Sequence, residues 1–467
     1  MTLVEEMAEF VSYTSYKTLS SKAVLQLKIR VLDAIGCAIG ALSAGPVVRI
    51  RALEEGFGGS PLCTLIGDGK TSPDRAALYN GALIRYLDFN DSFLAKGETC
   101  HPSDNVAPVL AASEYSGASG KDFLTALAVA YQVQCRMSEV APVRAKGFDH
   151  STQGAYAVAA GASRALSLSP TRTANAIAIA GAGLNALRVT RTGRLSNWKG
   201  LAYPFVSFGA LTAVFMAAKG ITGPLEVFEG NKGFMDSIAG KFEIDWKREN
   251  LEAVTRTIVK KYNAEVHSQS AIECILALQA ESGFKAEDVE SIDLRIFDVA
   301  YNIIGGGEEG NKKLVETKEQ ADHSLPYILS AALLDGEVTP RQYLSRRIIR
   351  GDVQSLLRKV NVRPDEQLSS MFPNAMPCVV TVRLKDGNSL ERSADDYEGF
   401  FTRPMSWDRA VEKFHGLTSS RVPEDLRMKI EGAVRRLDQI GIKELTSLLG
   451  RVGKKKRADQ RHHATLV

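Results

Sequence analysis

Apolar residues recur at helical spacing through the first half of the chain. Val24, Leu27, Val31 and Ile35 are spaced so that they fall on one face of a helix. Alanine-rich segments continue this pattern at 76–87, 106–115, 121–139, 152–166, 173–187 and 207–219. Small residues on helix faces let helix axes approach closely, and no strand pattern breaks this region convincingly. The sequence therefore predicts a compact multihelical body up to about residue 262.

The pattern changes after about residue 285. Residues 289–297 alternate apolar and polar side chains, as a half-buried strand does. Residues 377–384 do the same, and Asp386, Gly387 and Asn388 then predict a tight turn into a partner strand at 389–393. Helical patterns lie between these strands and again after Pro404, at 321–335, 351–359, 407–414 and 423–449.

These changes predict a mainly α fold with two domains. A length of 467 residues also favours two domains, because single hydrophobic cores stop growing at about 250–300 residues. Residues 1–268 and 399–455 are predicted to form a large multihelical domain, and residues 269–398 a smaller α+β domain inserted into it. Residues 456–467 are predicted to be a flexible basic tail.

Composition and charge argue against several classes of protein. Apolar and charged fractions of 45% and 24% are those of a globular protein. The net charge of +4 is small, and part of it lies in the tail, so no nucleic-acid partner is expected. The six cysteines are widely spread without a C-x-x-C pair, which argues against a zinc ribbon or an iron–sulfur cluster. We expect them to be buried free thiols.

The sequence gives no signal for export or for a membrane span. The N-terminus is acidic and lacks the apolar core of a signal peptide. The longest apolar stretch, residues 34–44, is too short to cross a bilayer. We therefore expect a cytoplasmic protein with no membrane partner.

A glycine motif at 181–186 reads G-x-G-x-x-A, which occurs in dinucleotide-binding sites. A true fingerprint follows a strand, opens a helix and has an acidic residue about 20 positions further on. Here the preceding residues are alanine-rich and helical, and no Asp or Glu stands at that distance. Close helix packing is the better interpretation, and no cofactor is predicted.

The segment 85–105 concentrates polar groups between two apolar helices. Such an interruption is costly unless the polar groups have a task, because buried charges need partners. Asp91 and Asp104 fit the ordinary role of caps, whereas Asp88 and His101 are the functional candidates. His101 stands beside Pro102, which fixes a turn, so its ring is well placed to point into a cleft. The segment predicts one wall of a site for a polyanionic small molecule.

Two further polar passages lie downstream in the helical half. His150 stands in a polar break before an alanine-rich helix. Lys199 closes a run that also contains Arg188, Arg191 and Arg194 and no acid. This run is either a solvated basic face or a rim that binds carboxylates, to which arginine pairs through two parallel hydrogen bonds.

Polar groups also surround the change of domain. Lys260, Glu265 and His267 form either a solvated hinge or a set of ligand contacts across an interdomain cleft. His323 and Tyr327 are about one turn apart on a predicted helix. These polar clusters offer cations and acid–base groups without metal-ligand spacing, a nucleophile elbow or a phosphate-binding loop. They favour proton abstraction beside a carboxylate and loss of a leaving group in a site without a metal.

Together these passages resemble the MmgE/PrpD family, which includes 2-methylcitrate dehydratase, cis-aconitate decarboxylase and an iminodisuccinate epimerase. The likeness runs from about residue 5 to residue 450. Its marks, whose order and spacing are specific, are Leu87-Asp-Phe-Asn-Asp-Ser92, Gly97, His101-Pro-Ser-Asp-Asn105, Trp198-Lys199, Lys219-Gly-Ile-Thr-Gly-Pro-Leu-Glu-Val-Phe-Glu-Gly230, Ala264-Glu-Val-His-Ser-Gln-Ser270, Ala321-Asp-His-Ser-Leu-Pro-Tyr327 and Leu334-Asp-Gly336.

The resemblance implies a homodimer in which the smaller α+β domain acts as a lid over a site that takes a small tricarboxylate. No metal and no cofactor are implied. The family's active-site positions fall on Asp88, Ser92, His101, His150, Lys199, Lys260 and Tyr327. Of these and their neighbours, we expect catalytic roles for His101, Lys199, Asp88, His150 and Tyr327, and substrate binding by Ser92, Arg194, Lys260, Glu265 and His267.

The dehydratase branch is the better match. Glu265 stands where the decarboxylase branch has a histidine, and the segment between Ser92 and His101 is longer than in the decarboxylase. We therefore expect a metal-independent dehydratase that converts 2-methylcitrate or citrate to an aconitate-type alkene. The alternatives are an epimerase, isomerase or decarboxylase of a related acid, and, more remotely, a non-catalytic helical scaffold that docks an acidic partner through its basic tail.

Overall fold

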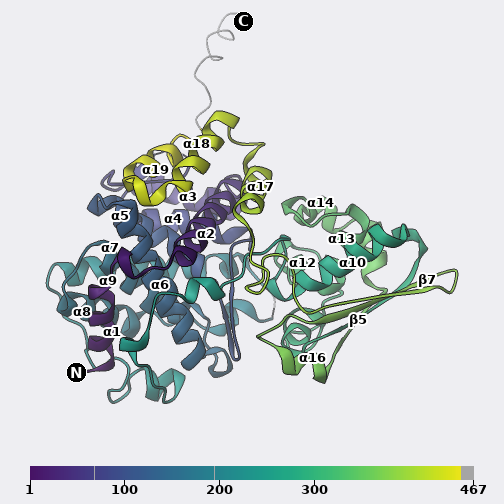
Figure 1. The fold of residues 1–467 in the computed structure, drawn as a ribbon, viewed down its shortest axis with the longest axis horizontal. Coiled ribbons are helices and arrows are strands. Elements are labelled where there is room, and N and C mark those ends of the chain that lie inside the picture. Colours follow the sequence, from purple (N-terminus) through teal and green to yellow (C-terminus); the bar gives the residue numbers. More distant parts are fainter. Residues whose placement is uncertain (68, 194, 454–467) are drawn as a thin grey trace, which may run out of the picture.

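Helices dominate the computed structural model, which describes residues 1–67, 69–193 and 195–453 (Figure 1). One large helical body contains both the first nine helices and the last three, and a smaller lobe with a four-stranded sheet lies beside it. The predicted fold class, mainly α with a small sheet in the C-terminal region, is confirmed.

The helices of the body are α1 (Leu3–Tyr13), α2 (Ser21–Gly40), α3 (Gly45–Phe57), α4 (Pro73–Tyr86), α5 (Val106–Ser116), α6 (Gly120–Val140), α7 (Ser151–Ala165), α8 (Pro170–Gly183), α9 (Ala202–Ala218), α17 (Trp407–Thr418), α18 (Glu424–Arg435) and α19 (Ile442–Leu449). Several begin at the side chains that mark helix starts in sequence. Ser119 caps α6 by accepting from the Asp122 amide, and Ser169 caps α8, which begins at Pro170.

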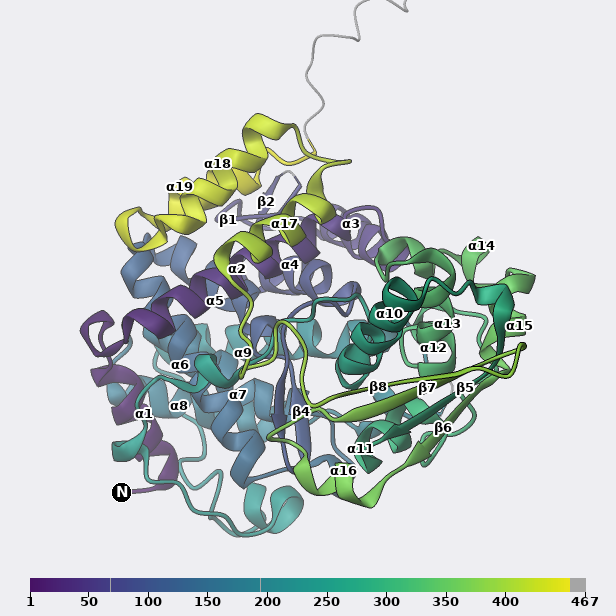
Figure 2. The ribbon, with the colours of Figure 1, turned by 45° about the vertical axis from the view of Figure 1, so that its right-hand side comes forward.

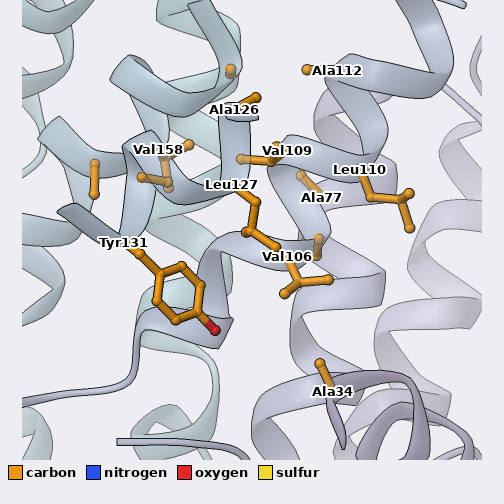
Figure 3. Packing of buried hydrophobic residues seen from close by; sticks show 14 of the residues in the cluster. Ala34, Ala77, Val106, Val109, Leu110, Ala112, Ala126, Leu127, Tyr131 and Val158 are labelled. Carbon is orange, nitrogen blue, oxygen red and sulfur yellow. The ribbon is translucent and has the colours of Figure 1, made fainter. Parts of the chain in front are cut away.

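Small side chains set the packing of the body. Ala77, Ala112 and Ala126 lie among valines and leucines from α4 to α7, so these helices approach closely (Figure 3). Gly181 is packed so tightly that an added Cβ would overlap the ring of Tyr156. Gly181 thus serves close helix packing, which is the predicted interpretation of the motif at 181–186.

The lobe is built on a sheet of strand order β6-β5-β7-β8. The strands are β5 (Val289–Ile296), β6 (Val360–Pro364), β7 (Cys378–Leu384) and β8 (Ser389–Ala394). β5 pairs in parallel with β6 and antiparallel with β7, and β7 and β8 form the predicted hairpin. Helices α10 (Gln269–Ser282) and α13 (Leu325–Asp335) pack over one face (Figure 2).

The other helices of the lobe are short. They are α11 (Asp298–Ala300), α12 (Lys318–Ala321), α14 (Ser345–Ile348), α15 (Gly351–Leu357) and α16 (Glu366–Met371). The lobe has a hydrophobic core of its own, whose residues run mainly from Ile258 to Phe400. The domain boundaries at 268/269 and 398/399 remain a prediction, and the predicted tail lies outside the described residues.

Two small hairpins in the body were not predicted. They are β1 (Cys63–Thr64) with β2 (Lys70–Thr71), and β3 (Phe93–Ala95) with β4 (Glu98–Cys100). Strands of two or three residues are too short to show a period of two in the sequence. The second hairpin matters most, because it joins Ser92 to His101 at the junction between body and lobe (Figure 2).

The cysteines and the apolar helices agree with the sequence. All six cysteines are buried and free. In the part of the chain that the structure describes, no single helix has the length and hydropathy to cross a bilayer; α2 and α3 reach that threshold only as a pair, which is bent by 87°.

Candidate active site

A charged cavity with about 480 Å³ of space lies where the body meets the lobe. Its lining residues are Arg85, Asp88, Glu98, Thr99, His101, Arg144, His150, Arg188, Arg191, Lys260, Glu265, His267, Ile303, Glu309 and His323. The space that admits the centre of a water molecule is only about 40 Å³, below the usual range of small-molecule sites, and the lining is far more polar than usual.

Asp88 follows the end of α4 and is surrounded by cations. Its Oδ1 atom lies 2.7 Å from Arg85 Nη1 and 2.8 Å from Lys260 Nζ, and its Oδ2 atom lies 3.2 Å from Lys199 Nζ. Burial alone raises the pKa of this carboxyl, but the three cations outweigh burial and hold the pKa well below the usual value. Asp88 also has a φ of +54°, a left-handed conformation that costs a non-glycine residue roughly 1–2 kcal/mol.

Lys199 joins Asp88 to the lobe. Its Nζ atom lies 2.9 Å from Asp322 Oδ1 and 2.8 Å from His323 Nδ1. Asp88, Asp322 and His323 place their ligand atoms within 4.8 Å of one another, close enough to surround a cation. The Lys199 ammonium contacts all three, so the side chain of the protein itself supplies the positive charge at this point.

The position of His101 is set by the β3–β4 hairpin. Its Nδ1 atom lies 2.8 Å from the Asp91 carbonyl oxygen and 3.0 Å from Ser92 Oγ. Ser92 is held in turn by two backbone hydrogen bonds with Ile258, of 2.9 and 2.8 Å. A carbonyl oxygen only accepts, so Nδ1 carries the proton of the neutral ring and Nε2 keeps a free lone pair.

Electrostatics keep His101 neutral. Burial lowers the pKa of the ring well below 6.5, and repulsion from Arg85 and Lys260 lowers it further against the opposing effect of Asp88. A neutral imidazole with a free Nε2 atom in a cavity is a proton acceptor.

In the ring of His150 the nitrogen without a hydrogen-bond partner in the described chain is Nδ1, whereas in His101 it is Nε2. Its Nε2 atom lies 2.8 Å from Arg191 Nη2, and a guanidinium only donates, so the Nδ1 atom of neutral His150 carries the proton. Among the described residues this buried Nδ1 atom has no hydrogen-bond partner. Burial lowers the pKa to about 3, with Asp149 opposing and Arg191 adding to the shift. The ring centroid is 5.3 Å from that of His101, so a donor and an acceptor lie side by side.

Glu265 and His267 form a pair in the segment that enters the lobe. Glu265 accepts from the His267 amide and from its Nδ1 atom, both at 2.8 Å. Burial opposes ionisation of Glu265, but His267 dominates and lowers the pKa to about 2. The Nε2 atom of His267 is buried without a hydrogen-bond partner in the described part of the chain.

The rim of the cavity carries arginines from two loops of the body. Arg188 Nη2 lies 2.8 Å and Arg144 Nη2 lies 3.4 Å from Glu309 Oε1, which comes from the lobe. Glu98 anchors this rim to β4, because its carboxylate accepts from the backbone amide of Arg144 at 3.0 Å.

Lys413 of α17 supports the site from behind. Its Nζ atom donates to the carbonyl oxygens of Phe89 and Lys260, both at 2.8 Å, and lies 2.6 Å from Asp33 Oδ1. The C-terminal helices thus hold the backbone on either side of the Asp88–Lys260 pair.

Most of the predicted site residues come together here. Those that line the cavity are Asp88, His101, His150, Lys260, Glu265 and His267, while Ser92 and Lys199 contact lining residues. Tyr327 does not line the cavity: it is buried in the lobe, and its hydroxyl donates to the Gln342 carbonyl oxygen. Arg194 lies outside the described residues. Asp91 accepts from the Ser103 amide at 2.8 Å, which is the predicted capping role.

Several residues of the site were not among the candidates. Arg85 stands one helical turn before Asp88, and that spacing was a usable signal. Arg188, Arg191 and His323 lie in passages that the sequence marked as polar, without a role for each. Arg144 and Glu309 gave no signal, because they lie 165 positions apart and meet only through the packing of lobe on body.

Comparison with known proteins matches nearly the whole chain to one family. The MmgE/PrpD N-terminal domain matches residues 5–247, and the MmgE/PrpD C-terminal domain matches residues 262–439. The cis-aconitate decarboxylase of Mus musculus is 25% identical over 471 residues, which cover 94% of this chain and 91% of the relative.

Relatives named for another activity are equally similar. The 2-methylcitrate dehydratase of Escherichia coli K12 is 26% identical over 426 residues, covering 84% of this chain and 85% of the relative. An alkylcitrate dehydratase of a fungal species is 26% identical over 487 residues, covering 96% and 94%. The two domain matches together span most of the sequence, and the chain belongs to the MmgE/PrpD family.

Proposed function

We propose that this protein is a lyase that removes water from 2-methylcitrate or citrate to give the aconitate-type alkene. The observation that carries the proposal is the free Nε2 atom of neutral His101 in a cavity with five arginine or lysine residues in its lining. Such cations hold carboxylates and stabilise the charge that develops when a proton leaves the carbon beside one. Dehydratase relatives of similar length support the same reaction.

In the proposed reaction His101 Nε2 takes the proton from carbon, the carbon–carbon double bond forms, and the hydroxyl leaves as water after receiving a proton. Lys199 is the proposed source of that second proton. Its Nζ atom contacts Nδ1 of His323, which lines the cavity, so in the proposed relay the ring takes this proton on Nδ1 and gives the proton on its Nε2 atom to the leaving hydroxyl. His150 lines the cavity and its Nδ1–H group has no partner among the described residues, so we propose that this group donates to a substrate oxygen.

Decarboxylation of cis-aconitate is the second candidate, because the mouse decarboxylase is similar over 94% of this chain. That reaction releases CO2 from an alkene and uses the same cations. The homodimer implied by the family resemblance and the cytoplasmic location expected from the sequence remain proposals as well.

A substrate panel tests the proposal. Purified protein is given citrate, 2-methylcitrate, cis-aconitate and iminodisuccinate, while the conjugated alkene is followed at about 240 nm, CO2 is trapped and products are identified by NMR. We expect alkene from a citrate without CO2. Release of CO2 from cis-aconitate, with no alkene from either citrate, would show that the protein is a decarboxylase and not a dehydratase. Epimerisation of iminodisuccinate without any alkene would contradict both activities.

A further inference from the structure

Arg144 and Arg188 are held as a pair by the backbone. The Arg188 amide donates to the Gly147 carbonyl oxygen at 2.9 Å, and Phe148 and Leu187 form an antiparallel bridge. Glu98 fixes the Arg144 backbone from the side of β4. The two guanidinium groups are therefore preorganised at the rim of the cavity, and both reach toward one carboxylate position.

That position is occupied by a side chain of the protein. Glu309 places its Oε1 atom against both arginines, and only 6% of its side chain is exposed. It stands on a loop of the lobe between Gly306 and Gly310, whose φ angles of +113° and +86° favour glycine. The Glu309 amide donates to the Asn302 carbonyl oxygen at 2.9 Å, which keeps the loop against the lobe.

The other cations of the cavity already have carboxylates. Arg85 and Lys260 pair with Asp88, and Arg191 pairs with Asp149. Within the described ranges, Glu309 is the one carboxylate that forms an ion pair with Arg144 or Arg188. When Glu309 withdraws, these two arginines keep no carboxylate of the described chain at ion-pair distance, although the buried Glu98 still acts on Arg188 electrostatically.

We propose that Arg144 and Arg188 form a subsite for a carboxylate of the substrate, and that Glu309 occupies this subsite as an internal competitor until the ligand displaces it. The inference rests on the proposed function, because it takes a tricarboxylate as the ligand. A ligand that binds only the state with Glu309 withdrawn has an apparent affinity reduced by the population of that state. Glu309 thus sets the affinity for any acid that reaches the rim.

The test measures binding apart from turnover. Tricarballylate carries three carboxylates but no hydroxyl to eliminate, and its Kd is measured by calorimetry for the full-length protein. We expect Glu309→Gln to lower Kd about three- to tenfold, because the variant keeps the size of the side chain and loses the competing charge. Arg188→Ala is expected to raise Kd about tenfold or more by removing one cation of the subsite.

Glu308→Gln is the matched control, because Glu308 is the exposed neighbour on the same loop, and its Kd should equal that of the unaltered protein. An unchanged or higher Kd in Glu309→Gln, with normal binding by the unaltered protein, would overturn the competitor role and leave the proposed function standing. No binding of tricarballylate by the unaltered protein would count against the tricarboxylate site itself and so against both proposals. Near-ultraviolet circular dichroism confirms that each variant is folded.

Discussion

The Nδ1 atom of His101 lies 2.8 Å from the carbonyl oxygen of Asp91, and this contact supports the proposal that His101 is the base of the site. The carbonyl oxygen of Asp91 keeps the proton of the neutral ring on Nδ1, so the Nε2 atom stays unprotonated and basic. His101→Gln keeps a donor for that carbonyl and removes the basic nitrogen, so we expect turnover to fall about 10²–10⁴-fold. The melting temperature should change little.

The control for this variant is His415→Gln, which alters a half-buried histidine on α17 that pairs with Glu431 away from the cavity. Turnover in the control should remain near that of the unaltered protein. Full activity of the His101 variant on the best substrate of the panel would remove His101 from the mechanism.

Acid is expected to destabilise the protein through its buried neutral histidines. The pKa of His150 is lowered to about 3 in the folded chain, against about 6.5 when unfolded. Between pH 6.5 and 5 the ring therefore binds a proton in the unfolded chain but not in the folded chain, so the free energy of unfolding falls as the pH falls. From pH 7.5 to pH 5 this one ring contributes about 2 kcal/mol of lost unfolding free energy.

Denaturant titrations of the unaltered protein and of His150→Gln at both pH values measure this contribution. The loss of unfolding free energy between pH 7.5 and pH 5 should be smaller in the variant by that amount. Equal losses in the two proteins would show that His150 is readily protonated in the folded state.

Lys199 is expected to be needed for stability as well as for turnover. Lys199→Met leaves Asp322 and His323 beside Asp88 without the ammonium that contacts all three, and breaking a buried ion pair costs about 3–5 kcal/mol. Asp322 keeps its ion pair with Lys318, at 2.7 Å, so adding Asp322→Asn to this variant removes a carboxylate that has lost one of its two cations and should restore part of the loss. Chemical unfolding measures each step.

Lys261→Met is a fitting control, because Lys261 also pairs with two carboxylates but keeps 25% of its side chain exposed. Exposed pairs of this kind contribute about 0–1 kcal/mol. If Lys199→Met lowers the free energy of unfolding no more than Lys261→Met does, the buried cluster around Lys199 contributes little to stability.

Alanine substitutions at two glycines of α8 distinguish the effect of side-chain packing on stability from the effect of helix propensity. Alanine is favoured over glycine in a helix by about 1 kcal/mol, yet Gly181→Ala should lower the unfolding free energy by about 1–3 kcal/mol, because its Cβ overlaps the Tyr156 ring. At Gly183 no described atom outside the helix's own backbone lies within 4 Å of the added carbon, so Gly183→Ala should be neutral or stabilising. Opposite signs in thermal melts confirm the packing role, and equal signs contradict it.

The sequence predicted what local chemistry decides. The β7–β8 hairpin follows from Asp386, Gly387 and Asn388, because a tight turn depends on a few neighbouring residues. His101 was found for the same reason, since a proline-fixed turn in an apolar region is visible without a structure.

Features of the site that depend on long-range packing were not predicted from the sequence. Tyr327 and His323 are four positions apart, but the chain alone does not say which of them faces the cavity, and the structure places only His323 there. The carboxylate of Glu309 is brought to the arginine rim by the contact of lobe with body, which no local pattern records.

The Lys413 contact behind the site has a consequence for how the protein is made. The amine that secures Phe89 and Lys260 enters the chain more than 150 residues after the last of the two. During synthesis the ribosome therefore delivers His101, Lys199 and Lys260 well before Lys413. A nascent chain stopped before α17 carries every proposed acid and base of the reaction and still lacks the amine that holds the backbone at Phe89 and Lys260.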